Sequence, residues 1–341
     1  MRKSLTYDDI QLVPKYSNIP SRNDIKLHTK LSRNYKLLNP IVASPMDTVC
    51  ELEMAWKMYT LGGVGCVHRF NSIEEQAKII KELYHRVYSD EREDDWNVPI
   101  MAAIGVSEND KGRATRLVEE GCNVLLIDVA HGHHKNVKKM LEWCKNHFGD
   151  KVDIIAGNIA TKEAAEDLES WGADGLRVGI GGGSLCTTRL KTGFGIPNVS
   201  CLEDVISVAK TPVMADGGIR SSGDMSKALA LGASQVMLGS LIAGTEEAPG
   251  QIIETTKGLY KRYRGSASLE TKVTHGQKTR NVEGESTTIP YKGGVKFIVN
   301  GLIDGVKSAL SYGGAQDLEH FIPSYVVVTN SGTNEAKPHL L

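Results

Sequence analysis

One loop of the chain combines glycines with a nucleophile. Gly181-Gly-Gly-Ser184 is followed two residues later by Cys186, then by two threonines and an arginine. Glycines, which have no Cβ, let backbone N–H groups close on a phosphate or a cation. A thiol beside such a loop, at the mouth of a strand, is a candidate covalent nucleophile. The alternative is a buried cysteine that packs as a small hydrophobic side chain. The neighbouring residues favour the nucleophile.

Two further loops have the same character. They are Ala215-Asp-Gly-Gly-Ile-Arg220 and Leu238-Gly-Ser240, and each follows a short apolar run. A glycine pair after a strand is often only a turn, but three such loops favour a common ligand. We therefore predict that one phosphate is bound by Ser184, Gly217, Gly218, Gly239 and Ser240.

Polar residues end three other apolar runs: Asp128, Asn158 and Asp216. A carboxylate in such a place can accept the paired hydroxyls of a ribose, including a nicotinamide ribose. Alternatively, each residue caps the following helix, and the sequence leaves both interpretations open. His131, His133 and His134 have no acidic or thiol partner at a matching spacing. We interpret them as loop residues near a ligand and not as a metal site.

The elements that must position these residues alternate regularly. Eight short apolar runs are separated by helix-like stretches such as 72–83, 162–170 and 224–231, the first with Ser72 and Glu75 as a capping box. The alternation predicts an α/β fold, a parallel (β/α)8 TIM barrel, with its site at the carboxyl ends of the strands. The runs are 39–46, 62–68, 99–105, 123–129, 153–159, 175–180, 212–218 and 235–240.

The pattern breaks after the eighth run. Residues 260–293 are polar and rich in turn formers, which indicates either a disordered loop or a mobile flap that closes on substrate. A helix is expected from about 295 to 311, a strand at 325–329 and a polar tail at 330–341. No linker divides the chain, so we expect residues 1–341 to form a single catalytic domain.

Composition excludes several classes of protein. The 341 residues include 40 basic and 41 acidic ones, so net charge gives no case for nucleic acid or a membrane surface as partner. No apolar run approaches the ~20 residues of a spanning helix, and the N-terminus lacks a secretory signal. The six cysteines include no C-x-x-C pair and are expected to be reduced, in a cytoplasmic protein.

Together, these motifs resemble the IMP dehydrogenase/GMP reductase family over nearly the whole chain. One departure is Gly182, where the family usually has proline. It puts in doubt a K⁺ site that the resemblance implies at the carbonyls of Gly181, Gly183 and Cys186. The matching pieces are Tyr7-Asp-Asp-Ile-Gln-Leu, Ser44-Pro-Met-Asp-Thr-Val49, Ile127-Asp-Val-Ala-His-Gly-His133, Ala156-Gly-Asn158, the Gly-Ser-x-Cys-Thr-Thr loop, Ala215-Asp-Gly-Gly218 and Gly244-Thr-Glu-Glu-Ala-Pro-Gly250.

The resemblance implies that the Cys186 thiolate adds to C2 of a purine nucleotide. The dehydrogenases oxidise IMP with NAD⁺ and then hydrolyse the adduct. The reductases expel ammonia from GMP and then reduce the same adduct with NADPH, which gives IMP.

The flap indicates which branch applies. Dehydrogenases use an Arg-Tyr pair there, whereas here Arg280 is followed by Asn281. Arg280-Asn-Val-Glu-Gly284 lies in the register of the reductase motif, which implies that Thr188 and Glu283 deliver a proton to the departing ammonia. Three stretches outside the flap also resemble reductases of Gram-positive bacteria: Ser21-Arg-Asn-Asp-Ile25, Val67-His-Arg-Phe70 and Ser311-Tyr-Gly-Gly314. Only about thirty residues separate His68 from Pro99, too few for the paired regulatory (CBS) modules of most dehydrogenases. Gly244–Gly250 and Glu335-Ala-Lys-Pro-His339 instead resemble dehydrogenases.

The favoured prediction is therefore an NADPH-dependent GMP reductase, with NADH not excluded and a homotetramer implied by the resemblance. The alternatives are an IMP dehydrogenase with an unusual flap, a nucleotide-binding protein without catalysis, and a flavin-dependent barrel. Asp128 and Ala130 would face the nicotinamide half of the cofactor. GMP would be held by Ser44, Asn158, Ser184, Asp216, Gly217, Gly218, Gly239, Ser240, Tyr263, Ser266, Ala267 and Gly284.

Overall fold

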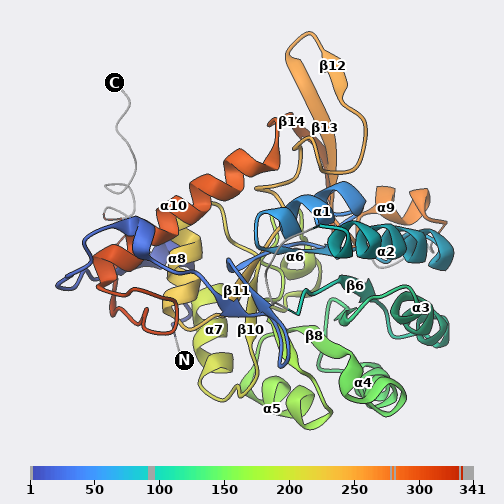
Figure 1. The fold of residues 1–341 in the computed structure, drawn as a ribbon, viewed down its shortest axis with the longest axis horizontal. Helices are drawn as coiled ribbons and strands as arrows, with labels where there is room; N and C mark the ends of the chain where they lie inside the picture. Colours follow the sequence, from blue (N-terminus) through green and yellow to red (C-terminus); the bar gives the residue numbers. More distant parts are fainter. Residues whose placement is uncertain (1–2, 91–96, 277–278, 280–281, 330–331, 333–341) are drawn as a thin grey trace.

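The centre of the protein is a closed barrel of eight parallel strands with helices outside it (Figure 1). The computed structural model describes residues 3–90, 97–276, 279, 282–329 and 332. Strands that follow one another in the chain are neighbours, and the last pairs with the first, so the predicted (β/α)8 TIM barrel is confirmed. The barrel strands are β4 (Ile41–Ala43), β5 (Val64–Val67), β6 (Met101–Ile104), β7 (Val124–Asp128), β8 (Asp153–Ile159), β9 (Gly175–Val178), β10 (Val213–Asp216) and β11 (Gln235–Leu238).

One helix begins at the cap that the sequence indicates. Ser72 accepts the Glu75 N–H at 3.2 Å and Glu75 accepts the Ser72 N–H at 2.9 Å, so the predicted capping box starts the second helix. The expected helix 162–170 has those bounds. The helices outside the barrel are α1 (Leu52–Thr60), α2 (Ile73–Tyr88), α3 (Glu108–Glu119), α4 (Lys135–Phe148), α5 (Lys162–Ser170), α7 (Asn198–Ile206), α8 (Ser222–Ala230) and α10 (Val295–Gly313).

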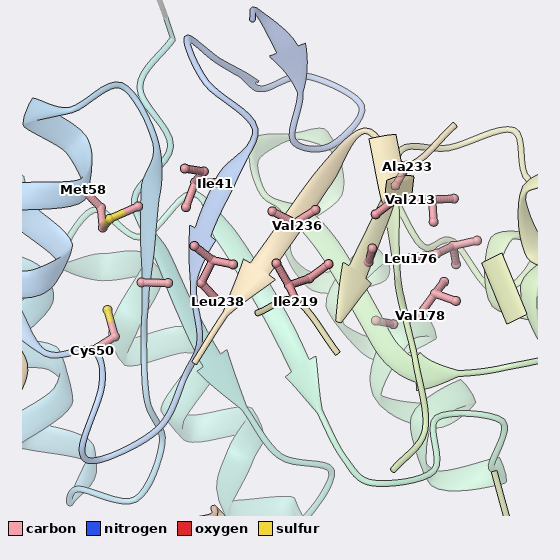
Figure 2. Packing of buried hydrophobic residues seen from close by; sticks show 14 of the residues in the cluster. Ile41, Cys50, Met58, Leu176, Val178, Val213, Ile219, Ala233, Val236 and Leu238 are labelled. Atoms are coloured by element: carbon pink, nitrogen blue, oxygen red, sulfur yellow. The ribbon is translucent and has the colours of Figure 1, made fainter. Parts of the chain in front are cut away.

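The strands are buried on both faces. Val42 and Leu126 belong to a cluster inside the barrel, whereas their chain neighbours Ile41 and Leu125 pack outward against the helices. Figure 2 shows part of this outer layer, with Ile41, Val236 and Leu238 on adjacent strands. Burial on both faces removes the polar alternation of a half-exposed strand, which is why each strand reads as a continuous apolar run.

The stretch after β11 is more ordered than its polar sequence indicates. Strands β12 (Ile253–Thr255), β13 (Gly258–Arg264) and β14 (Ser286–Pro290) form an antiparallel sheet that projects from the barrel, at the top of Figure 1. Helix α9 (Leu269–Thr274) lies between β13 and β14 in the chain. Most residues of this sheet are exposed, so it has no apolar face for a sequence pattern to reveal. Arg280 and Asn281 lie outside the described residues.

Two further two-stranded sheets lie outside the set of barrel strands. Strand β1 (Ile10–Leu12) pairs with β15 (Tyr325–Val327), which realises the strand expected at 325–329. A hairpin of β2 (Thr29–Lys30) and β3 (Lys36–Leu37) adds Leu31 to the inner cluster. Within the described residues, no helix is both long and apolar enough to cross a membrane. The expected tail at 330–341 lies outside the described residues, apart from residue 332. The short helices are α6 (Thr188–Thr192) and the 3-10 turns Tyr7–Asp9, Arg22–Asp24 and Gly149–Lys151.

Candidate active site

A cavity of about 340 Å³ opens at the carboxyl ends of the barrel strands. Every residue that the sequence singled out for catalysis or for binding a nucleotide, cofactor or cation lines it. These residues are Ser44, Asp128, Ala130, Asn158, Gly181, Gly183, Ser184, Cys186, Thr188, Asp216, Gly217, Gly218, Gly239, Ser240, Tyr263, Ser266, Ala267, Glu283 and Gly284.

Three side chains in this cavity form a chain of hydrogen bonds. The Cys186 thiol donates to Thr188 Oγ1 at 3.2 Å, and the Thr188 hydroxyl donates to Glu283 Oε2 at 2.7 Å. Cys186 is partly exposed. A proton can therefore pass between the thiol and the carboxylate through one hydroxyl.

Backbone contacts hold Glu283 in this position. The Thr187 N–H donates to the Glu283 carbonyl at 3.0 Å, and the Glu283 N–H donates to the Ala267 carbonyl at 3.1 Å. Gly284 forms an antiparallel bridge with Cys186 and a parallel bridge with Ser268. A Cβ at Gly284 would lie 3.0 Å from the Ser268 nitrogen, so a larger residue would push the two segments apart. This part of the flap is thus paired through its backbone with the cysteine loop.

The floor of the cavity contains a buried ion cluster centred on Arg177. Its guanidinium lies 2.5 Å from Asp128 Oδ1 and 3.0 Å from Asp216 Oδ2, and the Asn158 amide donates to the same Asp216 oxygen at 2.7 Å. Burial alone would lower the pKa of Arg177, but the two carboxylates outweigh it and raise that pKa above its ordinary value. Arg177 therefore stays charged and fixes both acids.

Asp128, Asn158 and Asp216 do not cap the helices that follow them, which was the alternative interpretation. The helices that follow Asp128, Asn158 and Asp216 are capped by other residues, namely His134, Thr161 and Ser221. Sequence reasoning missed Arg177 itself. The available signal was a charged residue within the apolar run 175–180.

The glycine loops and the flap meet across the cavity. Gly217 and Gly218 both have positive φ, at 90° and 76°, which favours glycine. The Ser184 hydroxyl and the Tyr263 hydroxyl are 3.0 Å apart, so a loop of the barrel contacts the flap directly. Burial raises the pKa of Tyr263 above its ordinary value, so its hydroxyl remains protonated.

The three histidines lie outside the cavity lining. His133 Nε2 is 2.8 Å from Asp167 Oδ2, and His134 caps α4. His131 is exposed. In the part of the chain that the structure describes, no group of His, Cys, Asp or Glu could hold a metal ion.

The other cysteines differ from Cys186. Five of them are free and buried, namely Cys50, Cys66, Cys122, Cys144 and Cys201. Burial raises the pKa of Cys122, Cys144 and Cys201 to about 12 and also raises the pKa of Cys50 and Cys66. These five thiols are therefore inert structural groups at neutral pH.

Comparisons with known proteins agree with this geometry. The family model described as "IMP dehydrogenase / GMP reductase domain" matches residues 4–339. An inosine-5′-monophosphate dehydrogenase of Cryptosporidium parvum is 37% identical over an alignment of 388 residues, gaps included. The alignment covers 99% of this chain and 95% of that protein. A GMP reductase of Streptococcus agalactiae is 36% identical over 328 residues, covering 95% of both chains.

A solved structure is also similar over the whole fold. It is a GMP reductase variant from Trypanosoma brucei in complex with guanosine 5′-monophosphate, with a TM-score of 0.94 and 31% identity. The match covers 100% of this chain and 98% of that one. The cysteine loop, the flap and the barrel thus lead to one conclusion: the chain belongs to the IMP dehydrogenase/GMP reductase family of oxidoreductases, whose members use nicotinamide cofactors.

Proposed function

We propose that the protein is a GMP reductase, which converts GMP to IMP and ammonia with NADPH through a covalent adduct between Cys186 and purine C2. The observation that carries this proposal is the hydrogen-bonded chain from Cys186 through Thr188 to Glu283. It can move a proton to a departing amine. A dehydrogenase must instead ionise a water, and the flap sequence has no Arg-Tyr pair for that task.

GMP would bind with its phosphate on Ser184, Gly217, Gly218, Gly239 and Ser240 and its base over Cys186. Asp216, held by Arg177 and Asn158, would accept the ribose hydroxyls. The other proposed contacts to GMP are Ser44, Tyr263, Ser266, Ala267 and Gly284. The related T. brucei structure, which contains guanosine 5′-monophosphate, supports this choice of ligand.

In the first stage, the sulfur of Cys186 replaces the amino group at C2 of the purine, and that amino group leaves as ammonia. Cys186 Sγ bonds to C2, and the bond between C2 and the exocyclic nitrogen breaks. The proton that leaves the thiol passes through Thr188 to Glu283 and returns by the same path to the departing nitrogen. Thiol and GMP thus give the adduct and NH₃, with all atoms balanced. An unprotonated amide is too poor a leaving group, so this general acid step is expected to contribute about 10²–10⁴-fold to the rate.

In the second stage, C2 gains a hydride while its bond to sulfur breaks, and the electron pair of that bond returns to Cys186 as thiolate. NADPH would supply the hydride when bound, with NADH as the alternative. Asp128 and Ala130 would face its nicotinamide half.

A cationic side chain lies near Asp128 in the cavity. It belongs to Arg69, whose buried Nε has no hydrogen-bond partner among the described residues, although it lies 3.6 Å from Asp128 Oδ2. A phosphate of the cofactor is a suitable partner for such a group.

Two further parts of the proposal concern the cysteine loop and assembly. A K⁺ ion would be held by the carbonyls of Gly181, Gly183 and Cys186. The Gly183 carbonyl already accepts the Cys186 N–H at 3.1 Å, which leaves one lone pair for the ion. We also expect a homotetramer.

A paired absorbance assay tests the direction of the reaction. The proposal predicts that GMP consumes NADPH, and that IMP with NAD⁺ gives no sustained production of NADH. IMP dehydrogenase is the second candidate, favoured by the 37% identity with the C. parvum enzyme. Sustained NADH production from IMP, without NADPH consumption from GMP, would establish it instead.

A further inference from the structure

Asn198 joins two of the loops that line the cavity, although it lines no part of the cavity itself. It is the first residue of α7 and follows the N-cap residue Pro197, but its side chain does not turn back onto the helix. The Asn198 amide instead donates to the Gly217 carbonyl at 2.5 Å, and its Oδ1 accepts from Arg189 at 3.3 Å. The side chain is almost fully buried, with the residue 7% exposed.

Arg189 continues the connection into the cysteine loop. Its Nε donates to the Ile180 carbonyl at 3.0 Å, and its Nη2 donates to the Ile196 carbonyl at 2.8 Å. A continuous path of hydrogen bonds therefore runs from Ile180, before the cysteine loop, to Gly217, at the end of β10.

The glycines of both loops leave the space that the Asn198 amide fills. A Cβ at Gly182 would lie 2.9 Å from both Asn198 Nδ2 and Oδ1, and one at Gly218 would lie 2.7 Å from Nδ2. A Cβ at Gly217 would lie 2.7 Å from the Gly182 carbonyl carbon. Gly182 and Asn198 are therefore a matched pair, which gives a steric reason for glycine where the family usually has proline.

The contact with Gly217 also orients a neighbouring donor. In a trans peptide, the C=O and N–H bonds point in opposite directions. The peptide that joins Gly217 to Gly218 is trans, so the bond from Asn198 to its carbonyl turns the Gly218 N–H away from Asn198. In the same way, the bond from Arg189 to the Ile180 carbonyl turns the Gly181 N–H away from Arg189. Gly181 and Gly218 both line the cavity.

We propose that Asn198 is a positioning residue for the nucleotide phosphate. Its carboxamide fixes the Gly217–Gly218 peptide so that the N–H of Gly218 is preorganised for a 5′-phosphate, and Arg189 ties that peptide to the loop of Cys186. This inference rests on the proposed function only in that the ligand is a purine nucleoside 5′-monophosphate. The effect of Asn198 is therefore specific to ligands that carry the phosphate.

The test compares Asn198→Ala and Asn198→Asp with the wild-type protein. The affinities of GMP, IMP and guanosine are measured from the protection that each gives Cys186 against iodoacetamide, without turnover. Loss of one buried hydrogen bond is expected to lower the affinities for GMP and IMP by roughly tenfold and to leave the affinity for guanosine unchanged. At saturating GMP, kcat is expected to be retained. Asn198→Asp keeps the side-chain volume and the Arg189 contact but places an oxygen against the Gly217 carbonyl. It should therefore lower the affinities for GMP and IMP at least as much as Asn198→Ala does. It also provides the comparison if Asn198→Ala fails to fold.

Asn123→Ala is the matched control. The Asn123 amide donates to the Val98 carbonyl at 2.8 Å and its Oδ1 accepts the Ile100 N–H at 2.7 Å, at the opposite end of the barrel. It should lower stability without any phosphate-selective effect. Unchanged GMP affinity in both Asn198 variants, or equal weakening of GMP and guanosine, would overturn the inference. If the wild-type protein does not reduce GMP but the phosphate-selective loss is found, the proposed function fails and this inference stands.

Discussion

Thr188 Oγ1 lies 2.7 Å from Glu283 Oε2 and donates a hydrogen bond to it, so a flap carboxylate is connected to the cysteine loop of the barrel. The same hydroxyl accepts from Cys186 at 3.2 Å. Backbone contacts support this pair, because the Gly284 bridge and the bond from the Thr187 N–H to the Glu283 carbonyl bring the flap to the loop. The chemistry of the site is thus assembled by tertiary structure from positions far apart in the sequence.

Glu283→Gln should keep the hydrogen bond but remove the proton that the departing amine needs. We expect kcat for GMP reduction to fall by about 10²–10⁴-fold, measured by NADPH absorbance. Glu285→Gln is the matched control, because Glu285 lies two residues further along and is exposed. Similar losses in the two variants would indicate a general effect of flap charge.

Thr188→Val removes the hydroxyl at nearly constant volume and interrupts the path between Cys186 and Glu283. Its kcat should fall about as far as that of Glu283→Gln, while Thr188→Ser should recover much of the rate. Because the two residues act as one path, the double variant should be little slower than either single variant. Additive losses in the double variant would contradict a shared path.

Iodoacetamide at pH 8 should label Cys186 alone, and GMP should protect it. The thiolate is the form that reacts. The pKa values of Cys122, Cys144 and Cys201 are raised to about 12, so these thiols are protonated at pH 8 and ionise only as the pH approaches 12. Peptide mapping by mass spectrometry identifies the labelled residue. Labelling of a buried cysteine at the rate of Cys186 would be inconsistent with the structure.

Arg177→Leu should destabilise the fold, because it leaves Asp128 and Asp216 without their shared cation. Removal of one partner from a buried ion cluster typically costs about 3–5 kcal/mol in the free energy of unfolding, which urea denaturation can measure. Arg86→Leu is the control, since Arg86 pairs with Glu53 and Glu82, whose side chains are 62% and 52% exposed. That variant should lose less than about 1 kcal/mol. Equal losses would mean that the cluster is not effectively buried.

The eight barrel strands could be predicted because each is buried on both faces and therefore appears in the sequence as an apolar run. The same logic failed for β12, β13 and β14, which are largely exposed and carry no apolar face. The glycine loops, Cys186 and the polar strand ends were identified because parallel strands bring their carboxyl ends to one rim.

Arg177, Arg189 and Asn198 were not found in this way. Each acts through partners on other segments, which the sequence alone does not bring together. Arg177 is marked only as a charge within an apolar run, and Arg189 only as the residue after the two threonines of the cysteine loop. The asparagine at the start of α7 even has the form of an ordinary helix-start residue, although its amide is directed at Gly217.

The most direct test of the central claim is to look for the bond between Cys186 and purine C2. The protein is incubated with GMP in the absence of NADPH, quenched, digested and analysed by mass spectrometry, while released ammonia is measured in parallel. We predict a purine nucleotide on the Cys186 peptide with one ammonia released per adduct, and neither in Cys186→Ala. Absence of the adduct, together with GMP reduction by Cys186→Ala at the wild-type rate, would contradict the account.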